Sequence, residues 1–166
     1  MIFMPYQERD AEAVLSWVTD ETMYYQWSSG VIGDYPATPD MLNSFYRKWK
    51  GEHHYMTFTL REDNFTPVGT MILRYPEENP RHVRIGFILV DPAQRGKGYG
   101  RLMVEKAIAY AKDYLNVETI GLGVYANNPG AKVLYEKLGF VETGEVEVEE
   151  HMGEPWECIE MELTVQ

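Results

Sequence analysis

A glycine-rich segment between two strongly patterned stretches constrains the fold of this chain more than any other feature. Residues 94–100 read Gln-Arg-Gly-Lys-Gly-Tyr-Gly. They follow the apolar run 85–90, which predicts a buried strand, and they precede a stretch from Arg101 whose apolar residues recur at helical spacing. Glycine tolerates positive φ, and the free N–H groups of a first helical turn attract anions. The sequence therefore predicts a phosphate-binding turn between a strand and a helix.

The glycine spacing in this turn excludes two common phosphate-binding motifs. Gly96, Gly98 and Gly100 form G-x-G-x-G, whereas a dinucleotide fingerprint needs G-x-G-x-x-G. Lys97 is followed by glycine, whereas a P-loop needs Ser or Thr there. The remaining pattern, Arg95-x-x-Gly98-x-Gly100, resembles the R/Q-x-x-G-x-G/A signature of the GNAT (general N-acetyltransferase) superfamily, where the loop holds the pyrophosphate of acetyl-CoA. The alternative is a flexible turn with solvent-facing charges.

A second segment carries the same resemblance. Residues 128–140 read Asn-Pro-Gly-Ala-Lys-Val-Leu-Tyr-Glu-Lys-Leu-Gly-Phe, which resembles the superfamily pattern N-x-x-A-x-x-L-Y-x-x-x-G-F. From the residues alone, Asn128 and Pro129 begin a helix and Gly139 ends it. The resemblance is specific over residues 82–141, and the N-terminal half is similar to the ribosomal-protein N-acetyltransferase branch.

The order of the predicted strands and helices matches the GNAT arrangement. We expect a single domain, residues 1–166, with an α+β (α/β/α layered) fold, in which helices flank a central mixed, mostly antiparallel sheet of about seven strands. Asp10 is expected to cap the first helix, and Gly51 to end the second. The predicted strands are 2–6, 55–60, 68–75, 82–90, 118–124, 141–149 and 156–165. The predicted helices are 10–18, 38–50, 101–115 and 129–138, and residues 22–37 are predicted as a loop.

The amino-acid composition limits the kinds of molecule that the chain is expected to bind. The net charge of −11 argues against nucleic acid, which needs clustered Lys and Arg. No stretch reaches the ~20 apolar residues that span a bilayer, so no membrane partner is expected. The single cysteine, Cys158, excludes an internal disulfide, reads as a packed thiol and favours a cytoplasmic location. No metal is predicted, because the histidines lack ligand spacing. The four histidines are His53, His54, His82 and His151.

The resemblance implies an acetyl-CoA site. The pantetheine arm would lie between strands 82–90 and 118–124 and pair with backbone groups of Ile88, Leu89 and Val90. The N–H of Leu89 would bond the thioester oxygen and stabilise the oxyanion that develops there. The pyrophosphate would be held by the loop amides and one side chain, and Asn128 would contact the pantetheine or cap its helix. The loop residues are Arg95, Gly96, Lys97, Gly98, Tyr99 and Gly100, and the side chain is that of Arg101.

The resemblance also implies a proton donor. Tyr135 would be the general acid, because a phenol with a pKa near ~10 can protonate a departing thiolate. The alternative is a core tyrosine whose hydroxyl is satisfied. Relatives often carry a glutamate as general base where this chain has Arg84, which puts such a base in doubt. Other candidates are Glu21, Glu77 and Glu78, and the reaction could also proceed without a dedicated base.

The expected reaction transfers an acetyl group to a primary amine of a small molecule or a protein N-terminus, by direct attack in a ternary complex. Tyr25 and Trp27, in the aromatic segment 20–37, would line the amine pocket through cation–π contacts, or would pack on the sheet. Two alternatives stay open: a non-catalytic acyl-CoA sensor of the same fold, and an unrelated nucleotide-binding domain. The exposed final strands could pair in a homodimer.

Overall fold

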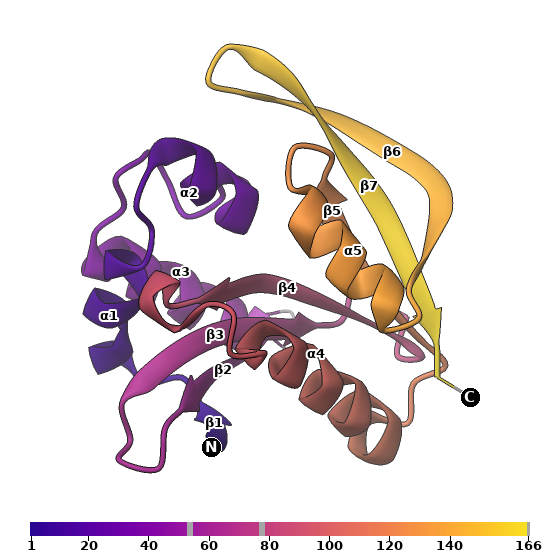
Figure 1. The fold of residues 1–166 in the computed structure, drawn as a ribbon, viewed down its shortest axis with the longest axis horizontal. Coiled ribbons are helices and arrows are strands. Elements are labelled where there is room, and N and C mark those ends of the chain that lie inside the picture. The colour runs from indigo at the N-terminus through magenta and orange to yellow at the C-terminus, as the bar shows by residue number, and fades with distance from the viewer. Residues whose placement is uncertain (53–54, 77–78, 166) are drawn as a thin grey trace.

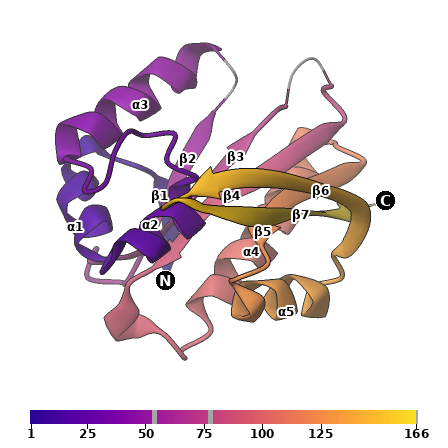
Figure 2. The ribbon, with the colours of Figure 1, turned by 90° about the horizontal axis from the view of Figure 1, so that it is seen from above.

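A seven-stranded sheet forms the middle layer of the fold and separates two groups of helices (Figures 1 and 2). The computed structural model describes residues 1–52, 55–76 and 79–165. The strands are β1 (Ile2–Pro5), β2 (Met56–Arg61), β3 (Pro67–Arg74), β4 (His82–Val90), β5 (Thr119–Tyr125), β6 (Val141–His151) and β7 (Glu154–Thr164). The helices are α1 (Ala11–Ser16), α2 (Glu21–Ser28), α3 (Pro39–Glu52), α4 (Tyr99–Tyr110) and α5 (Pro129–Lys137).

The sheet is split along its one parallel pair of strands. The strand order is β1-β2-β3-β4-β5-β7-β6, and every neighbouring pair except β4–β5 is antiparallel. The β4–β5 pairing covers three residue pairs, from His82↔Thr119 to Arg84↔Gly121. Beyond Arg84 the two strands diverge, whereas β5 stays paired with β7 as far as Tyr125. The mixed, mostly antiparallel sheet agrees with the predicted fold class.

A β-bulge in β4 lies three residues beyond Arg84, the last residue of β4 that pairs with β5. Phe87 and Ile88 together stand opposite the single residue Met71 of β3. Phe87 has a φ of 50°, in the left-handed region that non-glycine residues seldom occupy. The Trp27 indole Nε1 of α2 donates a hydrogen bond of 3.1 Å to the Phe87 carbonyl. Since bulges bend the strand that contains them, this one turns the end of β4 away from β5.

Apolar side chains fill both faces of the sheet. The face under α4 and α5 buries a large cluster that includes Met103, Leu122 and Tyr135. On the opposite face, strands β1–β4 pack against α1, α2 and α3 through a second cluster that includes Trp17 and Tyr24. On this second face, α2 also reaches the final hairpin, where the ring of Tyr25 stacks on that of His151 of β6 (Figure 2).

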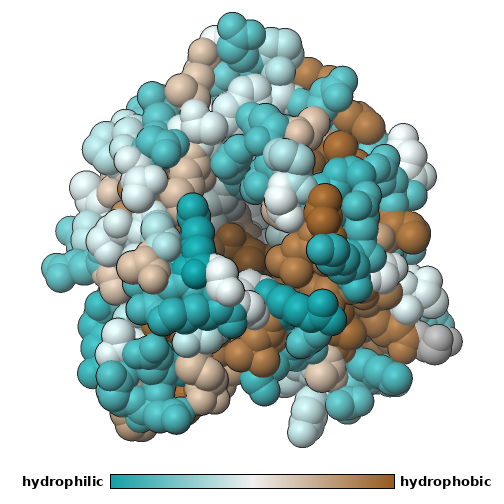
Figure 3. Space-filling view, viewed as in Figure 1, coloured by the Kyte–Doolittle hydropathy of each residue, from teal (hydrophilic) through white to brown (hydrophobic). Residues whose placement is uncertain are grey.

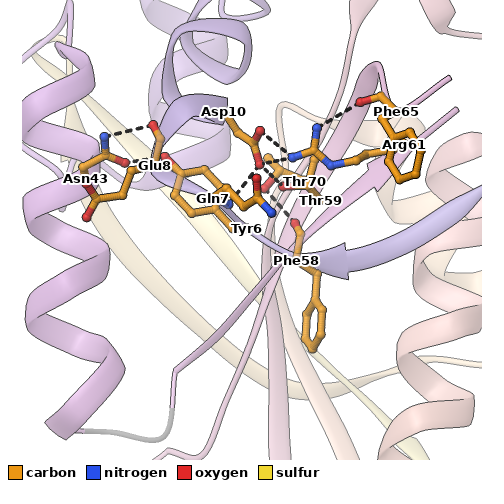
Figure 4. Close-up of polar contacts among 10 residues, drawn as sticks. All are labelled: Tyr6, Gln7, Glu8, Asp10, Asn43, Phe58, Thr59, Arg61, Phe65 and Thr70. Carbon is orange, nitrogen blue, oxygen red and sulfur yellow. Dashed lines mark hydrogen bonds and ion pairs between the residues drawn. The ribbon is translucent and has the colours of Figure 1, made fainter.

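A buried ion pair joins the N-terminal segment to β2 (Figure 4). Asp10 is 2% exposed and Arg61 is 3% exposed. The Asp10 carboxylate accepts hydrogen bonds of 2.5 and 2.6 Å from Arg61 Nη2 and one of 3.0 Å from the Thr59 hydroxyl. Arg61 Nη1 donates to the carbonyl of Phe65 at 3.0 Å. Asp10 lies next to α1 as predicted, but its side chain makes no capping bond to that helix because it is held by Arg61.

The structure corrects three local predictions. Residues 22–37 were expected to be a loop, yet α2 occupies Glu21–Ser28 because Asp20 caps it through the N–H of Met23, at 2.8 Å. Gly51 does not end α3, which continues to Glu52. The final turn is shorter than expected, since β6 and β7 extend two residue pairs further and pair as far as His151↔Glu154. Among the described residues, no helix is long and apolar enough to cross a membrane.

Candidate active site

A cavity of about 1600 Å³ opens where β4 and β5 separate, and we call it the central cavity. Figure 3 shows a hollow near the middle of the molecule, with apolar side chains at its bottom and hydrophilic ones at its rim. Residues of α4 and α5, such as Gly100 and Tyr135, line one part of the central cavity. Residues of α3, such as Phe45 and Trp49, line another. The central cavity therefore reaches both helical layers through the gap in the sheet.

The glycine loop ends at the first turn of α4, which faces the central cavity. Gly96 and Gly98 have φ values of 78° and 80°, so both positions favour glycine. Gly98 is the N-cap of α4, no side chain caps this end, and the first intrahelical bond runs from the N–H of Leu102. The N–H groups of the preceding turn thus have no intrahelical acceptor. With the helix dipole, they form an anion-binding site at the cavity wall.

Two of the three predicted loop cations reach the central cavity. Arg95 and Arg101 line it, whereas Lys97 is not among the lining residues. Lys97 Nζ instead donates to the side chain of Gln94 at 2.5 Å. Arg101 pairs with Glu105 one turn along α4 at 2.7 Å. Gly96, Gly98, Tyr99 and Gly100 also line the central cavity.

The edge of β4 presents backbone groups to the opening. Ile88, Leu89 and Val90 all line the central cavity. The N–H of Asp91 donates to the carbonyl of Val68 on β3 at 2.9 Å. Because backbone groups alternate in an antiparallel ladder, the N–H of Leu89 also points toward β3. Ile88 and Val90 therefore direct their groups to the opening, which does not fit the prediction that the Leu89 N–H does so.

Tyr135 of α5 lies against the wall of the central cavity. Its side chain is 8% exposed and packs edge-on against the ring of Phe140, with the ring centroids 6.1 Å apart. Its hydroxyl makes no hydrogen bond with any residue that the structure describes, and burial raises the pKa of Tyr135 to about 12. Tyr135 therefore stays protonated at neutral pH and can act as a proton donor. Asn128, at the start of α5, also lines the central cavity and caps the helix by accepting from the N–H of Ala131 at 3.4 Å.

Arg84 occupies the vertex where β4 and β5 part. Its guanidinium forms a bidentate pair with Glu160 of β7, with N–O distances of 2.6 and 2.9 Å. Both residues line the central cavity. A Cβ on Gly123 of β5 would lie 2.9 Å from Cys158 Sγ and 3.1 Å from a Glu160 oxygen. The glycine on β5 thus makes room for this polar cluster, a role that the sequence analysis did not find.

Only one of the three candidates for a general base, Glu21, lies among the described residues. Glu21 does not line the central cavity. Glu77 and Glu78, like His53 and His54, lie outside the described residues. No group of three His, Cys, Asp or Glu side chains suited to a metal ion occurs in the described part of the chain. The carboxylates that line the central cavity are Asp20, Glu147, Glu149 and Glu160.

The two predicted aromatic residues of α2 take different positions. Trp27 is buried and lines the central cavity, where it holds the bulge of β4. Tyr25 does not line it, and its ring stacks on that of His151 with 4.9 Å between centroids. Tyr25 therefore packs against the final hairpin, as the alternative interpretation had it.

A polar cluster between β5 and the final hairpin was also missed. The Tyr125 hydroxyl lies 2.7 Å from Ser29 Oγ, 2.6 Å from a Glu149 oxygen and 3.0 Å from His151 Nε2. Burial, and then the hydrogen bond with Glu149, raise the pKa of Tyr125. This cluster connects α2 to β5 and β6 at the rim of the central cavity.

A model of the acetyltransferase (GNAT) domain matches residues 1–141 of the chain. The protein belongs to the GNAT family. Spermidine N(1)-acetyltransferase from Vibrio cholerae is 33% identical over 106 residues, which are 63% of this GNAT chain and 60% of that enzyme. A peptidyl-lysine N-acetyltransferase from Escherichia coli is 34% identical over 95 residues, 57% of this chain and 55% of that one. The aligned region thus spans less than two thirds of either relative.

The solved structures agree on the fold. Spermidine N-acetyltransferase from Vibrio cholerae, crystallised with CoA and spermine, superposes with a TM-score of 0.81 over 98% of this chain and 94% of that one. At 24% identity, this likeness shows the GNAT fold and no more. The predicted family and fold class are confirmed, whereas membership of the ribosomal-protein branch stays a prediction.

Proposed function

We propose that the protein transfers the acetyl group of acetyl-CoA to a primary amine, by direct attack in a ternary complex. The observation that carries this proposal is the passage through the sheet, which has an anion-binding helix end on one side and a chamber for an acceptor on the other. Membership of the GNAT family supports it, as do the named activities of the relatives on spermidine and on peptidyl-lysine.

The first turn of α4 and the glycine loop would bind the pyrophosphate of the cofactor. Amides of residues 95–100 supply the donors, and Arg95 and Arg101 supply positive charge. The pantetheine would extend between β4 and β5, where the backbone groups of Val90 face the opening. Such an arm carries amides of its own, which suit the unpaired strand edges.

The reaction would need a hydrogen-bond donor for the thioester oxygen and a proton donor for the leaving sulfur. The amine nitrogen attacks the carbonyl carbon, and the backbone N–H of Ile88 or Val90 stabilises the resulting oxyanion. As the intermediate collapses, the C–S bond breaks and the thiolate takes a proton from the Tyr135 hydroxyl. The amine proton passes to solvent or to a carboxylate of the cavity wall.

The alternative is an acyl-CoA sensor without turnover. Two observations favour catalysis: the unbonded hydroxyl of Tyr135 at the cavity wall, and an acceptor side that is open rather than filled. One continuous sheet from β1 to β6 supports a single catalytic domain over residues 1–166, and use of acetyl-CoA supports a cytoplasmic location. A homodimer would use the exposed edge strand β6.

A thermal melt with acetyl-CoA, followed by a thiol-release assay against a panel of amines, tests the proposal. A ligand at ~100 times its Kd should stabilise the fold by about 2.7 kcal/mol, which raises the Tm by several degrees. No shift at millimolar acetyl-CoA would contradict the cofactor site. A shift without thiol release from any amine would favour the sensor.

A further inference from the structure

Two arginines on neighbouring strands lie side by side and line the central cavity. Arg74 of β3 and Arg84 of β4 are direct cross-strand partners, and both line the central cavity. Like charges directly opposite each other weaken a pair of strands. Repulsion between the two guanidinium groups therefore destabilises the sheet at this position. The two arginines differ in the contacts that offset this repulsion.

Arg84 has a hydrogen-bonded carboxylate partner, whereas Arg74 has none among the described residues. Glu160 holds both terminal nitrogens of Arg84 at 2.6 and 2.9 Å. The half-buried guanidinium of Arg74 forms no hydrogen bond or ion pair with any residue that the structure describes. Burial lowers the pKa of Arg74 and the charge of Arg84 adds to this effect, while Tyr55 and Glu160 oppose it in part. A partly buried cation that donates to no anion in the described part of the chain is costly, so an anionic group of a ligand would stabilise it.

The space next to Arg74 has the shape of a small-molecule site. We call it the acceptor chamber; it is the part of the central cavity lined by Phe45, Trp49, Tyr55 and the two arginines. The ring of Tyr55 lies 6.0 Å from that of Trp49 and 6.1 Å from that of Phe45, between centroids. An apolar wall thus stands beside a free guanidinium, an arrangement suited to a ligand with both an apolar body and an anion.

Negatively charged side chains also line the central cavity. Glu160 and Glu147 line the central cavity from β7 and β6. Residues 138–166 contain nine glutamates and neither Lys nor Arg, so the strands on this side attract cations. Glu160 is already held by Arg84, so a ligand in the acceptor chamber would meet the guanidinium of Arg74 and the carboxylate of Glu147.

We propose that the acetyl acceptor is a small amine that also carries a carboxylate, as a free amino acid does, and that Arg74 binds this carboxylate. The inference rests on the proposed acetyltransferase function and names the substrate class of the same site. The substrate carboxylate pairs with Arg74, and the amine of the same molecule is left free to attack the thioester. An amine without a carboxylate would leave Arg74 unpaired and would lose this contact.

Matched pairs of acceptors test the proposal with the wild-type protein. Each pair is an amino acid and its decarboxylated amine: lysine and cadaverine, ornithine and putrescine, phenylalanine and phenethylamine, tyrosine and tyramine. Amino acid amides extend the series, because they keep the α-carbon and lose only the negative charge. We expect kcat/KM to be about 10- to 100-fold higher for the carboxylate-bearing member of the preferred pair, the usual range for a charged hydrogen bond.

Three variants assign the effect. Arg74→Gln should lower kcat/KM for the amino acid about 10- to 100-fold and leave the decarboxylated partner unchanged, whereas Arg74→Lys should retain part of the preference. Arg47→Gln is the matched control, because Arg47 is an exposed arginine paired with Glu8 on the surface. Stabilisation by acetyl-CoA should be the same in all of them.

Several outcomes would overturn the proposed role of Arg74. Equal or better turnover of the decarboxylated amines by the wild type, or an unchanged preference in Arg74→Gln, would overturn the proposal. So would turnover of decarboxylated amines with no turnover of any carboxylate-bearing acceptor. No stabilisation of the wild-type protein by acetyl-CoA, or stabilisation without turnover of any amine at all, would instead overturn the proposed function itself, so the two failures are distinguishable.

Discussion

Breaking the buried pair of Asp10 and Arg61 by removing one of its charges should strongly destabilise the fold. Replacing Asp10 with Asn keeps the size of the side chain and removes its charge. The guanidinium of Arg61, 3% exposed, would then be left as an uncompensated buried cation whose Nε already lacks a partner. Breaking a buried pair in this way costs about 3–5 kcal/mol. Domains of this size lose roughly 2–4 °C of Tm per kcal/mol, so Asp10→Asn should lower the Tm by roughly 6–20 °C.

Urea denaturation and thermal melts of the wild type and the variant measure this loss. Asp63→Asn is the control: Asp63 is 89% exposed and its carboxylate pairs with the N-terminal amine at 2.6 Å. Exposed pairs contribute about 0–1 kcal/mol, so this variant should melt close to the wild type. A double variant, Asp10→Leu with Arg61→Met, removes both charges and should recover much of the stability.

The reasoning would be refuted by a loss of less than about 1 kcal/mol in Asp10→Asn, or by a loss equal to that of the control. A double variant as unstable as Asp10→Asn would also contradict it. In that case the cost would come from packing, and the uncompensated charge of Arg61 would not be its source.

Three further predictions concern the site. Gly98→Ala forces a side chain into a φ of 80° at the N-cap of α4, so acetyl-CoA should raise the Tm less than in the wild type; an equal shift would argue against pyrophosphate binding there. Tyr135→Phe should lower kcat about 100-fold with acetyl-CoA stabilisation retained, and an unchanged kcat would exclude the acid role. Burial raises the pKa of Cys158 to about 11, so its thiol is protonated at pH 8. Native Cys158 should react with iodoacetamide about 100-fold more slowly than in the unfolded chain, with the rate rising as pH approaches 11; equal rates would contradict this burial.

The parts of the fold that were predictable are those encoded by local patterns. The strand–loop–helix unit around residues 94–100 and the helix from Pro129 depend on spacings within one segment, and the structure places both as expected. The helix α2 was missed because it has only eight residues, and its buried aromatic residues, Tyr24 and Trp27, show the helical spacing only once. The cap at Asp20, followed by that spacing, was the signal that could have found it.

The acceptor side could not be read from the sequence, because it depends on strand order. Arg84 and Glu160 are 76 residues apart and meet only because β7 inserts between β5 and β6. The pairing of Arg74 with Arg84 likewise depends on the register across a bulge. For the same reason the backbone direction of Leu89 could not be known before the ladder was seen, since one bulged residue reverses the alternation.

The gap between β4 and β5 has a consequence for the backbone itself. A sheet normally exposes unpaired N–H and C=O groups only at its two outer strands, but this one has two more edges inside the molecule, beyond Arg84 and Gly121. Amide protons there should exchange with solvent deuterium quickly in the unliganded protein, although they belong to central strands. A bound pantetheine arm would act as a substitute strand between the two edges. The cofactor would then be a structural element of the sheet as well as a reactant, and its arrival should be visible as slowed exchange along both strands.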